Sequence, residues 1–173
     1  TKNTQPAILT VSYSIFKVLK DEFDFQFNNF KYFAGHSLGE YSALVSADSL
    51  IFEDAIFLLH ERGQAMQNAV PIGKGRMVAV LGLSASDLKQ LLIERKSKIQ
   101  GICEIANDNA DGQIIISGDK MSVDSFLEFL KEKKIKFIPL KVSAPFHCSL
   151  MRPAAKVMEQ KIQNTLFKDP KIT

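Results

Sequence analysis

The sequence predicts an α/β protein in which a small α+β domain is inserted into a larger layer of helices and strands. Two observations lead to this fold class. The pentapeptide Gly35–Gly39 places Ser37 between an apolar run and a helix-forming run, which is the strand, turn and helix of an α/β-hydrolase-like layer with parallel strands. From Gly75 on, the patterns follow the order strand, helix, strand, strand, helix, strand, which is the ferredoxin-like (βαββαβ) arrangement.

The larger layer opens with a helix over 4–21. Its apolar residues recur at helical spacing, at Ile8, Val11, Ile15, Val18 and Leu19. An apolar strand, 30–34, leads into the turn, and a helix follows the turn from Tyr41. A second long helix, 52–69, carries acidic residues in its first turn, where they complement the helix dipole.

The inserted domain alternates between strand and helix periodicity. Strands are predicted at 77–81, 102–106, 113–117 and 135–142, and helices at 86–96 and 122–133. The polar run 107–112 predicts a turn between the two middle strands, and a final helix, 153–163, begins at a proline. We therefore assign 1–74 and 140–173 to an incomplete α/β core and 75–139 to the insertion. A ligand is expected in the cleft between them.

Composition restricts the class of protein. The chain is 46% hydrophobic and 24% charged, which is ordinary for a globular protein, and its net charge of +3 is too small to indicate a nucleic-acid partner. No apolar run reaches the length of a membrane span, so we expect a cytoplasmic protein. Cys103 and Cys148 form neither a metal-binding nor a disulfide pattern. The chain begins with Thr1 and is expected to be a fragment.

Ser37 is the candidate nucleophile. A sharp turn between strand and helix holds its hydroxyl out of the backbone, and Gly35 and Gly39 are expected to avoid collisions where the two elements nearly touch. The backbone N–H of Leu38, at the start of the following helix, is one candidate donor of an oxyanion hole. This predicts acyl transfer through a serine ester. The alternative is that the glycine-rich turn serves packing alone.

A serine nucleophile needs a base, and the sequence offers three histidines. His36 is adjacent to Ser37 and is expected to shape the turn, while His60 fits a surface or core position because the HExxH pattern fails at Gln64. His147 follows the last strand of the insertion, and serine before histidine is the chain order of α/β-hydrolase sites. We favour His147 as the base. The alternative is that His147 is a loop histidine that caps the final helix.

Arg62 falls on what should be the inward face of its helix. Two interpretations stay open. The guanidinium is either one half of a structural ion pair, with its stem packed on apolar neighbours, or a fork that takes a carboxylate on the acyl group in two parallel hydrogen bonds.

Together these residues resemble the malonyl-CoA:acyl carrier protein transacylase family, the acyltransferases of fatty-acid and polyketide synthesis. The resemblance is carried by the long run Ala34–Val45 and by shorter matches at Thr4–Ala7, Arg62-Gly63, Met66-Gln67, Asn107–Asn109 and Phe146–Cys148. It implies that Ser37 is the nucleophile, that His147 acts as general base and then general acid, that Arg62 anchors the malonyl carboxylate and that the Leu38 N–H serves the oxyanion hole. It also implies substrate contacts from Met66, Asn109 and Phe146.

The resemblance implies no cofactor, because the coenzyme A thioester is the substrate, and no metal. Malonyl-CoA and acyl carrier protein are the implied partners, with no nucleic acid and no membrane. The family's Gly-Gln-Gly-Ser-Gln motif, whose glutamine supplies the second oxyanion donor, and the loop that orients the histidine are both missing from the chain. The alternatives are the acyltransferase domain of a polyketide synthase, a serine esterase or thioesterase, and a carrier-protein docking fragment that uses Lys131–Lys134.

Overall fold

The computed structural model describes residues 2–172, and its contacts divide the chain into two compact units. Unit 1 takes the residues up to Ala65 and from Lys156 on, and unit 2 is Met66–Ala155. The boundaries therefore fall inside two helices. They differ from the predicted boundaries at 74/75 and 139/140, because the segment that carries His147 packs on the sheet of unit 2: a side chain at Gly75 would lie 2.2 Å from Pro145.

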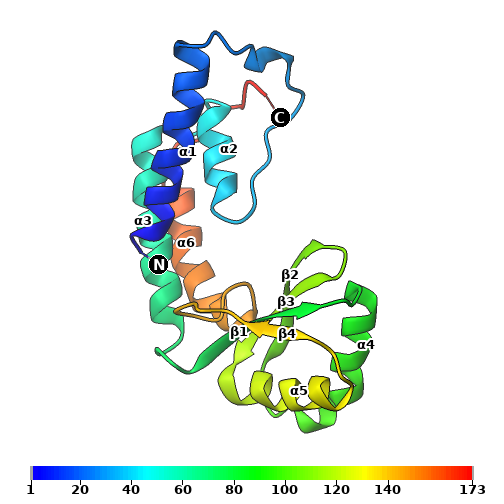
Figure 1. Ribbon diagram of the computed structural model, residues 1–173. Coiled ribbons are helices and arrows are strands. Elements are labelled where there is room, and N and C mark those ends of the chain that lie inside the picture. Colours follow the sequence, from blue (N-terminus) through cyan, green and yellow to red (C-terminus); the bar gives the residue numbers. More distant parts are fainter. Residues whose placement is uncertain (1, 173) are drawn as a thin grey trace. The chain divides into compact units, whose positions relative to one another are not determined.

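Unit 1 is helical in its described residues. Its elements are α1 (Thr4–Asp21), the short η1 (Phe27–Asn29), α2 (Gly39–Ser46), most of α3 (Phe52–Ala69) and most of α6 (Arg152–Gln163). The helices α1, α2, α3 and α6 lie close together in Figure 1 and share one core. Their core is a cluster of buried side chains: Leu9, Val45, Leu50, Ala55, Leu58, Leu59 and Met158. Burying a leucine of this kind stabilises the fold by about 1.5–3 kcal/mol. The predicted helices of this layer are confirmed.

The strand predicted at 30–34 is wrong. Its residues belong to no strand, because all four strands of the described chain lie in unit 2. A strand is stabilised by hydrogen bonds to a neighbouring strand, and unit 1 offers none here. The apolar run is used for ring packing instead: the Phe33 ring meets Phe16 edge-on with centroids 5.9 Å apart, and Phe27 lies 4.3 Å from Phe16.

Unit 2 contains an antiparallel sheet with helices on one face (Figure 1). The elements follow in the predicted order, as β1 (Gly75–Leu81), α4 (Ala85–Arg95), the short η2 (Lys96–Lys98), β2 (Cys103–Ala110), β3 (Gln113–Asp119), α5 (Lys120–Glu132) and β4 (Phe137–Pro139). The strands lie in the order β2-β3-β1-β4. The short helix η3 (Ser149–Met151) then leads into α6.

Strand alternation gives the sheet two different faces. Val78 and Val80 pair with Ile116 and Ile114, and all four are buried under α4 and α5. The helices contribute Leu88, Val123, Phe126, Leu127, Phe129 and Leu130 to that core. Met77, Ala79 and Ile115 point to the opposite face, where they pack with Leu140 and Phe146. This second face therefore supports the segment next to His147.

The turn predicted at 107–112 is wrong in extent. Residues 107–110 belong to β2, and only Asp111 and Gly112 connect it to β3. Gly112 has φ +71°, which a glycine adopts at no steric cost. Two irregularities in the β2–β3 register absorb the polar residues, so that a run typical of a loop continues the strand. Asn109 consequently lies at an exposed strand end.

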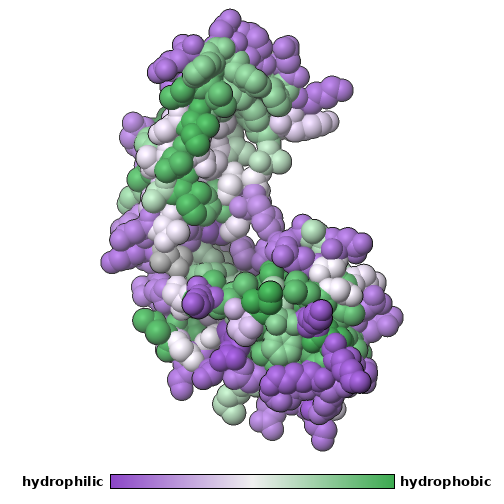
Figure 2. Space-filling view, viewed as in Figure 1, coloured by the Kyte–Doolittle hydropathy of each residue, from purple (hydrophilic) through white to green (hydrophobic). Residues whose placement is uncertain are grey.

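The surface of α1 is apolar on its outer side. Val11 is 60% exposed and Ile15 is 57% exposed. Figure 2 shows hydrophobic residues gathered along the upper, helical part of the molecule. An apolar stripe of this kind is typical of a surface that packs against another surface. Among residues 2–172, however, the helices all lack the combination of length and apolar character that crossing a bilayer demands.

Asp119 joins two elements of unit 2. One carboxylate oxygen accepts the Ser122 N–H at 2.9 Å and caps α5, and the other accepts the Ile102 N–H at 2.6 Å. Burial raises the pKa of this carboxyl, but the backbone hydrogen bonds outweigh it and hold the pKa below its ordinary value. The ionised form is therefore the one that the fold stabilises.

We predict that Asp119→Ala lowers the free energy of unfolding by about 1–2 kcal/mol, because it removes this cap. Since the folded pKa is depressed, the stabilisation is present above the ordinary value of 3.8 and is lost as the pH falls through the folded pKa. Urea unfolding followed by circular dichroism measures both effects. The exposed Asp108→Ala is the control and should be neutral; an equal loss in both variants would contradict the cap.

Candidate active site

The candidate nucleophile sits on a strained turn. Ser37 has φ +58°, in the left-handed region that non-glycine residues rarely adopt. The turn is closed by the N–H of Gly39, which donates to the His36 carbonyl at 3.0 Å, and by the N–H of Glu40, which donates to the Ser37 carbonyl at 3.2 Å. Strain of this kind costs about 1–3 kcal/mol and is typical of functional sites. The sharp turn predicted at Ser37 is present.

The two glycines of the turn have different roles. A Cβ at Gly35 would lie 1.8 Å from the backbone carbon of Gly39, so only glycine fits there. At Gly39 an added Cβ would meet no described atom within 4 Å. The expectation that both glycines avoid collisions is therefore confirmed for Gly35 and wrong for Gly39.

Leu38 is the N-cap residue of α2. Its N–H comes before the first hydrogen-bonded turn of the helix, in the position where amides lack an acceptor within the helix. Such an amide, beside the Ser37 hydroxyl and at the positive end of the helix dipole, suits a developing oxyanion. The role of Leu38 as an oxyanion donor stays a prediction.

Arg62 on α3 reaches the nucleophile. Its Nη2 donates a hydrogen bond to the Ser37 hydroxyl oxygen at 3.0 Å, and its Nη1 donates a short hydrogen bond to the side-chain oxygen of Gln5. Among the described residues no carboxylate forms an ion pair with Arg62. The interpretation as half of a structural ion pair is therefore wrong for this part of the chain, and the guanidinium is held by two neutral groups.

The surroundings of Arg62 favour an anion. Burial lowers the pKa of the guanidinium, while the charges of Tyr41 and Glu40 act in the opposite direction; an arginine nevertheless stays protonated at any ordinary pH. Burial likewise raises the pKa of the Tyr41 hydroxyl, against the effect of Arg62. A half-buried cation with neutral hydrogen-bond partners can exchange one of them for a carboxylate oxygen and gain a stronger, charge-assisted bond.

Gln5 is the site residue to which the sequence analysis gave no role. It is buried at the start of α1, one helical turn before the buried Leu9, so that a polar side chain lies on the apolar face of the helix. A polar residue on the apolar face of a helix is the signal that singled out Arg62. The same signal on α1 would have singled out Gln5 as well. The Gln5 side-chain oxygen accepts a hydrogen bond from Nη1 of Arg62, and this orients the guanidinium so that Nη2 is directed toward Ser37.

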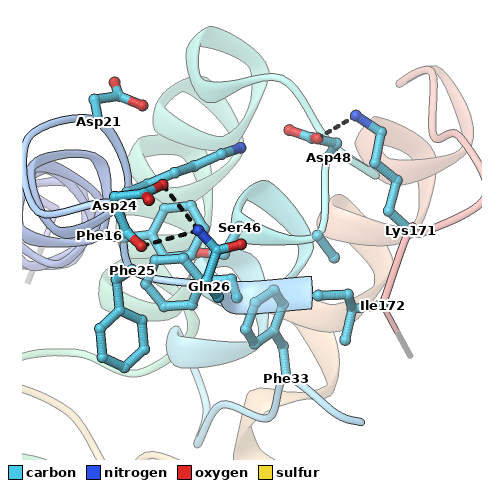
Figure 3. A pocket seen from close by; sticks show the side chains of 13 residues that line it. Phe16, Asp21, Asp24, Phe25, Gln26, Phe33, Ser46, Asp48, Lys171 and Ile172 are labelled. Carbon is cyan, nitrogen blue, oxygen red and sulfur yellow. Dashed lines mark hydrogen bonds and ion pairs between the residues drawn. The ribbon is translucent and has the colours of Figure 1, made fainter. Parts of the chain in front are cut away.

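Two hollows are lined by residues of unit 1. One is lined by residues of the Ser37 turn, including Gly35, His36 and Leu38, and by Ile8 and Ser12 of α1. The other, in Figure 3, is lined in part by phenylalanine rings, and the ion pair of Asp48 with Lys171 lies at one side of it. The first hollow therefore borders the serine turn, whereas the second is lined by no residue of that turn.

His147 lies in unit 2, on the segment between β4 and η3. Its side chain is exposed, and its φ of +56° is again left-handed. The N–H of the preceding Phe146 donates to the Met77 sulfur at 3.3 Å. The strained backbone is thus tied to β1 one residue before the histidine.

The structure brings some of the predicted site residues together. Ser37, Leu38 and Arg62 meet in unit 1. The remaining candidates all belong to unit 2: Met66, Asn109, Phe146 and His147. Met66 is buried and Phe146 is half-buried. The pairing of His147 with Ser37 and the substrate contacts of Met66, Asn109 and Phe146 stay predictions.

We predict that Gly35→Ala destabilises the protein by about 1–3 kcal/mol, because the added methyl group collides with the backbone of α2. Gly39→Ala is the matched control, and its stability should be unchanged or slightly raised because its Cβ enters open space. Thermal unfolding followed by circular dichroism compares the two. Equal melting temperatures would contradict the account of the turn.

Comparison with known proteins identifies relatives over the whole chain. The malonyl CoA-acyl carrier protein transacylase of Bacillus subtilis (strain 168) is 42% identical over 173 residues, which cover 98% of this chain and 52% of that protein. The protein of the same name from Haemophilus influenzae is 42% identical over 175 residues, covering all of this chain and 54% of that protein. The chain thus spans about half the length of these relatives.

Solved structures agree. A crystal structure of FabD from Acinetobacter baumannii is 44% identical with a TM-score of 0.91, over 99% of this chain and 54% of that one. A malonyl-transacylase in complex with its type II polyketide synthase acyl carrier protein is 37% identical with a TM-score of 0.90, over 99% of this chain and 54% of that one. The acyl transferase domain model matches residues 1–173. A match of this extent, over a chain with a strained serine turn, shows that the protein belongs to the acyl transferase domain family.

Proposed function

We propose that the protein transfers the malonyl group from malonyl-CoA to the phosphopantetheine thiol of acyl carrier protein, through a malonyl ester on Ser37, in fatty-acid synthesis. Membership of the acyl transferase domain family and the names of the relatives support this activity. One structural observation carries the choice of substrate. The Arg62 guanidinium lies 3.0 Å from the Ser37 hydroxyl oxygen, within reach of a carboxylate on an acyl group bound to that serine.

In the first half-reaction, Ser37 attacks the thioester carbonyl of malonyl-CoA while His147 takes the hydroxyl proton. The Leu38 N–H donates to the oxyanion of the tetrahedral intermediate, where charge develops. The carbon–sulfur bond then breaks, and the proton on His147 passes to the departing coenzyme A thiolate. Malonyl-Ser37 and free coenzyme A are the products.

In the second half-reaction, the roles run in reverse. His147 takes the proton of the phosphopantetheine thiol, the thiolate attacks the ester carbonyl, and the bond to the Ser37 oxygen breaks. The proton returns from His147 to Ser37. The carrier protein leaves with the malonyl group as a thioester, and the enzyme is restored.

Arg62 selects the acyl group in this scheme. A malonyl carboxylate can accept hydrogen bonds from both terminal nitrogens of the guanidinium, which fits the geometry of the fork. An acetyl group leaves the half-buried cation with only its neutral partners, so it gains nothing from the charge. Phe146, next to the base, is the further candidate for excluding a branched acyl chain.

The finer features of the fold belong to the same proposal. Residues 1–74 and 140–173 would belong to the acyltransferase core and 75–139 would form the ferredoxin-like insertion. The parallel strands of an α/β-hydrolase-like layer in that core are not among the strands of residues 2–172. The strand order β2-β3-β1-β4 and the two helices on one face of the sheet support the second assignment. Malonyl-CoA and acyl carrier protein are the partners, no further cofactor takes part, and the reaction takes place in the cytoplasm.

A second candidate is malonyl transfer in polyketide synthesis. The likeness to a malonyl-transacylase whose structure includes a polyketide synthase acyl carrier protein favours it. The chemistry at Ser37 is the same, and only the acceptor differs. A serine esterase is disfavoured because it has no need for a cation at the nucleophile. Incubation of the intact protein with malonyl-CoA and each carrier protein separates these functions, since an esterase releases free malonate.

We predict that Ser37→Ala abolishes the covalent malonyl adduct, because the ester oxygen is lost. Mass spectrometry of the intact protein after incubation with malonyl-CoA detects the adduct. Ser42→Ala, a serine on α2, is the matched control and should be malonylated as the wild type is. An adduct that persists in Ser37→Ala would disprove the assignment of the nucleophile.

We predict that Arg62→Ala lowers kcat/KM for malonyl-CoA by about 10- to 100-fold, in line with the loss of a charge-assisted hydrogen bond, while acetyl-CoA is used as well as before or better. The rates of acyl-enzyme formation with the two thioesters give the ratio. Arg76→Ala, which removes an arginine paired with Asp124 in unit 2, should leave the ratio unchanged. An unaltered ratio in Arg62→Ala would place the carboxylate anchor elsewhere.

A further inference from the structure

We infer that Glu104 of β2 is a positioning residue, which holds the segment that carries His147 by clamping Ser149. The inference rests on the proposed role of His147 as the base. It concerns a carboxylate that does not itself take part in the acyl transfer steps.

The clamp uses both oxygens of the carboxylate. Oε2 of Glu104 accepts the backbone N–H of Ser149 at 2.7 Å, and Oε1 accepts the Ser149 hydroxyl at 2.8 Å. The residues are 45 positions apart in sequence, so these bonds join distant parts of the chain. Both are short, partly buried and charge-assisted, and hydrogen bonds of that kind contribute about 1.5–3 kcal/mol. Ser149 begins η3, where amides lack helical acceptors.

His147 is held from both sides. One residue before it, the N–H of Phe146 donates to the sulfur of Met77 on β1. Two residues after it, Ser149 is held by Glu104 on β2. Between these anchors the histidine backbone has the left-handed φ of +56°, which persists only where the surrounding structure imposes it.

The two anchors stand in one row across the sheet. Glu104 pairs with Ser117 of β3, and Ser117 pairs with Met77 of β1. Residues directly opposite each other on neighbouring strands present their side chains to the same face. Met77 belongs to the buried cluster on the face opposite to α4 and α5. The segment from Phe146 to Ser149 therefore lies across this row, with one end fixed on β1 and the other on β2.

This arrangement connects the sheet to catalysis. If the Glu104 clamp is removed, the segment after His147 loses its tie to β2, and the strained histidine can relax to a different φ. The imidazole then no longer approaches Ser37 in the productive geometry, and a displacement of about 1 Å is enough to lower a rate 100-fold. Binding of malonyl-CoA, which relies on Arg62, is unaffected.

The test compares Glu104→Ala, Glu104→Gln and Ser149→Ala in the intact protein with malonyl-CoA and carrier protein. Glu104→Ala should lower kcat by about 10- to 100-fold while KM for malonyl-CoA stays within about twofold, since the base and not the anchor is displaced. Glu104→Gln keeps one accepting oxygen and Ser149→Ala keeps the backbone N–H bond, so both should lie between Glu104→Ala and the wild type. Glu128→Ala, an exposed carboxylate on α5, is the matched control.

A second readout follows the segment itself. Cys148 lies between His147 and Ser149, and its thiol donates to the Pro145 carbonyl at 3.2 Å. In a Cys103→Ala background, the rate of Cys148 alkylation should rise in the order wild type, Glu104→Gln, Glu104→Ala. Both substitutions remove the same negative charge, so a rate set by charge alone would be equal in the two variants, and that result would overturn the clamp.

The controls keep this inference separate from the proposed function. If His147→Ala retains the wild-type kcat, the proposed function fails. If His147→Ala is inactive while Glu104→Ala has the wild-type kcat, the positioning role of Glu104 alone is disproved. A Glu104→Ala protein that loses activity through KM rather than kcat would also contradict it.

Discussion

The hydrogen bond from Arg62 to Ser37 is the interaction on which the candidate site depends. A guanidinium on the inner side of α3 must be given partners, because an unpaired buried cation is costly. The partners are the serine of the turn and Gln5 of α1, so that one cation joins α1, the turn and α3. The strain at Ser37 and the requirement for glycine at position 35 bring the hydroxyl to the place where Arg62 meets it. One hydrogen-bond network thus holds both the candidate nucleophile Ser37 and the proposed carboxylate anchor Arg62.

The proposed base, His147, belongs to the other unit of the chain. His147 is carried by the sheet of unit 2, where Met77 and Glu104 hold the residues on either side of it. Both Ser37, the candidate nucleophile, and His147, the proposed base, occupy left-handed backbone conformations, which cost free energy unless neighbouring contacts compensate for them. In each unit a polar contact from a rigid element supplies that compensation: Arg62 at the serine and Glu104 two residues beyond the histidine.

Sequence reasoning succeeded where a local pattern decides the outcome. Apolar periodicity predicted the helices and the order of strands in unit 2, and the glycine-serine turn predicted Ser37. Sequence reasoning failed where the local structure depends on partners that are distant in sequence. The apolar run 30–34 forms no strand because no strand lies beside it, and the polar run 107–110 continues a strand because β3 pairs with it. Gln5 and Glu104 are polar residues whose partners lie 57 and 45 positions away, so no local signal names those partners.

The structure of the malonylated protein tests the central claim most directly. A crystal structure of the intact protein, trapped as the malonyl ester of Ser37, shows where the carboxylate lies. The account predicts that both carboxylate oxygens are within hydrogen-bond distance of the Arg62 nitrogens, with the bond from Arg62 to Ser37 given up and Gln5 still beside the guanidinium. A carboxylate bound by other residues, with Arg62 still on Ser37 as in the free protein, would contradict it.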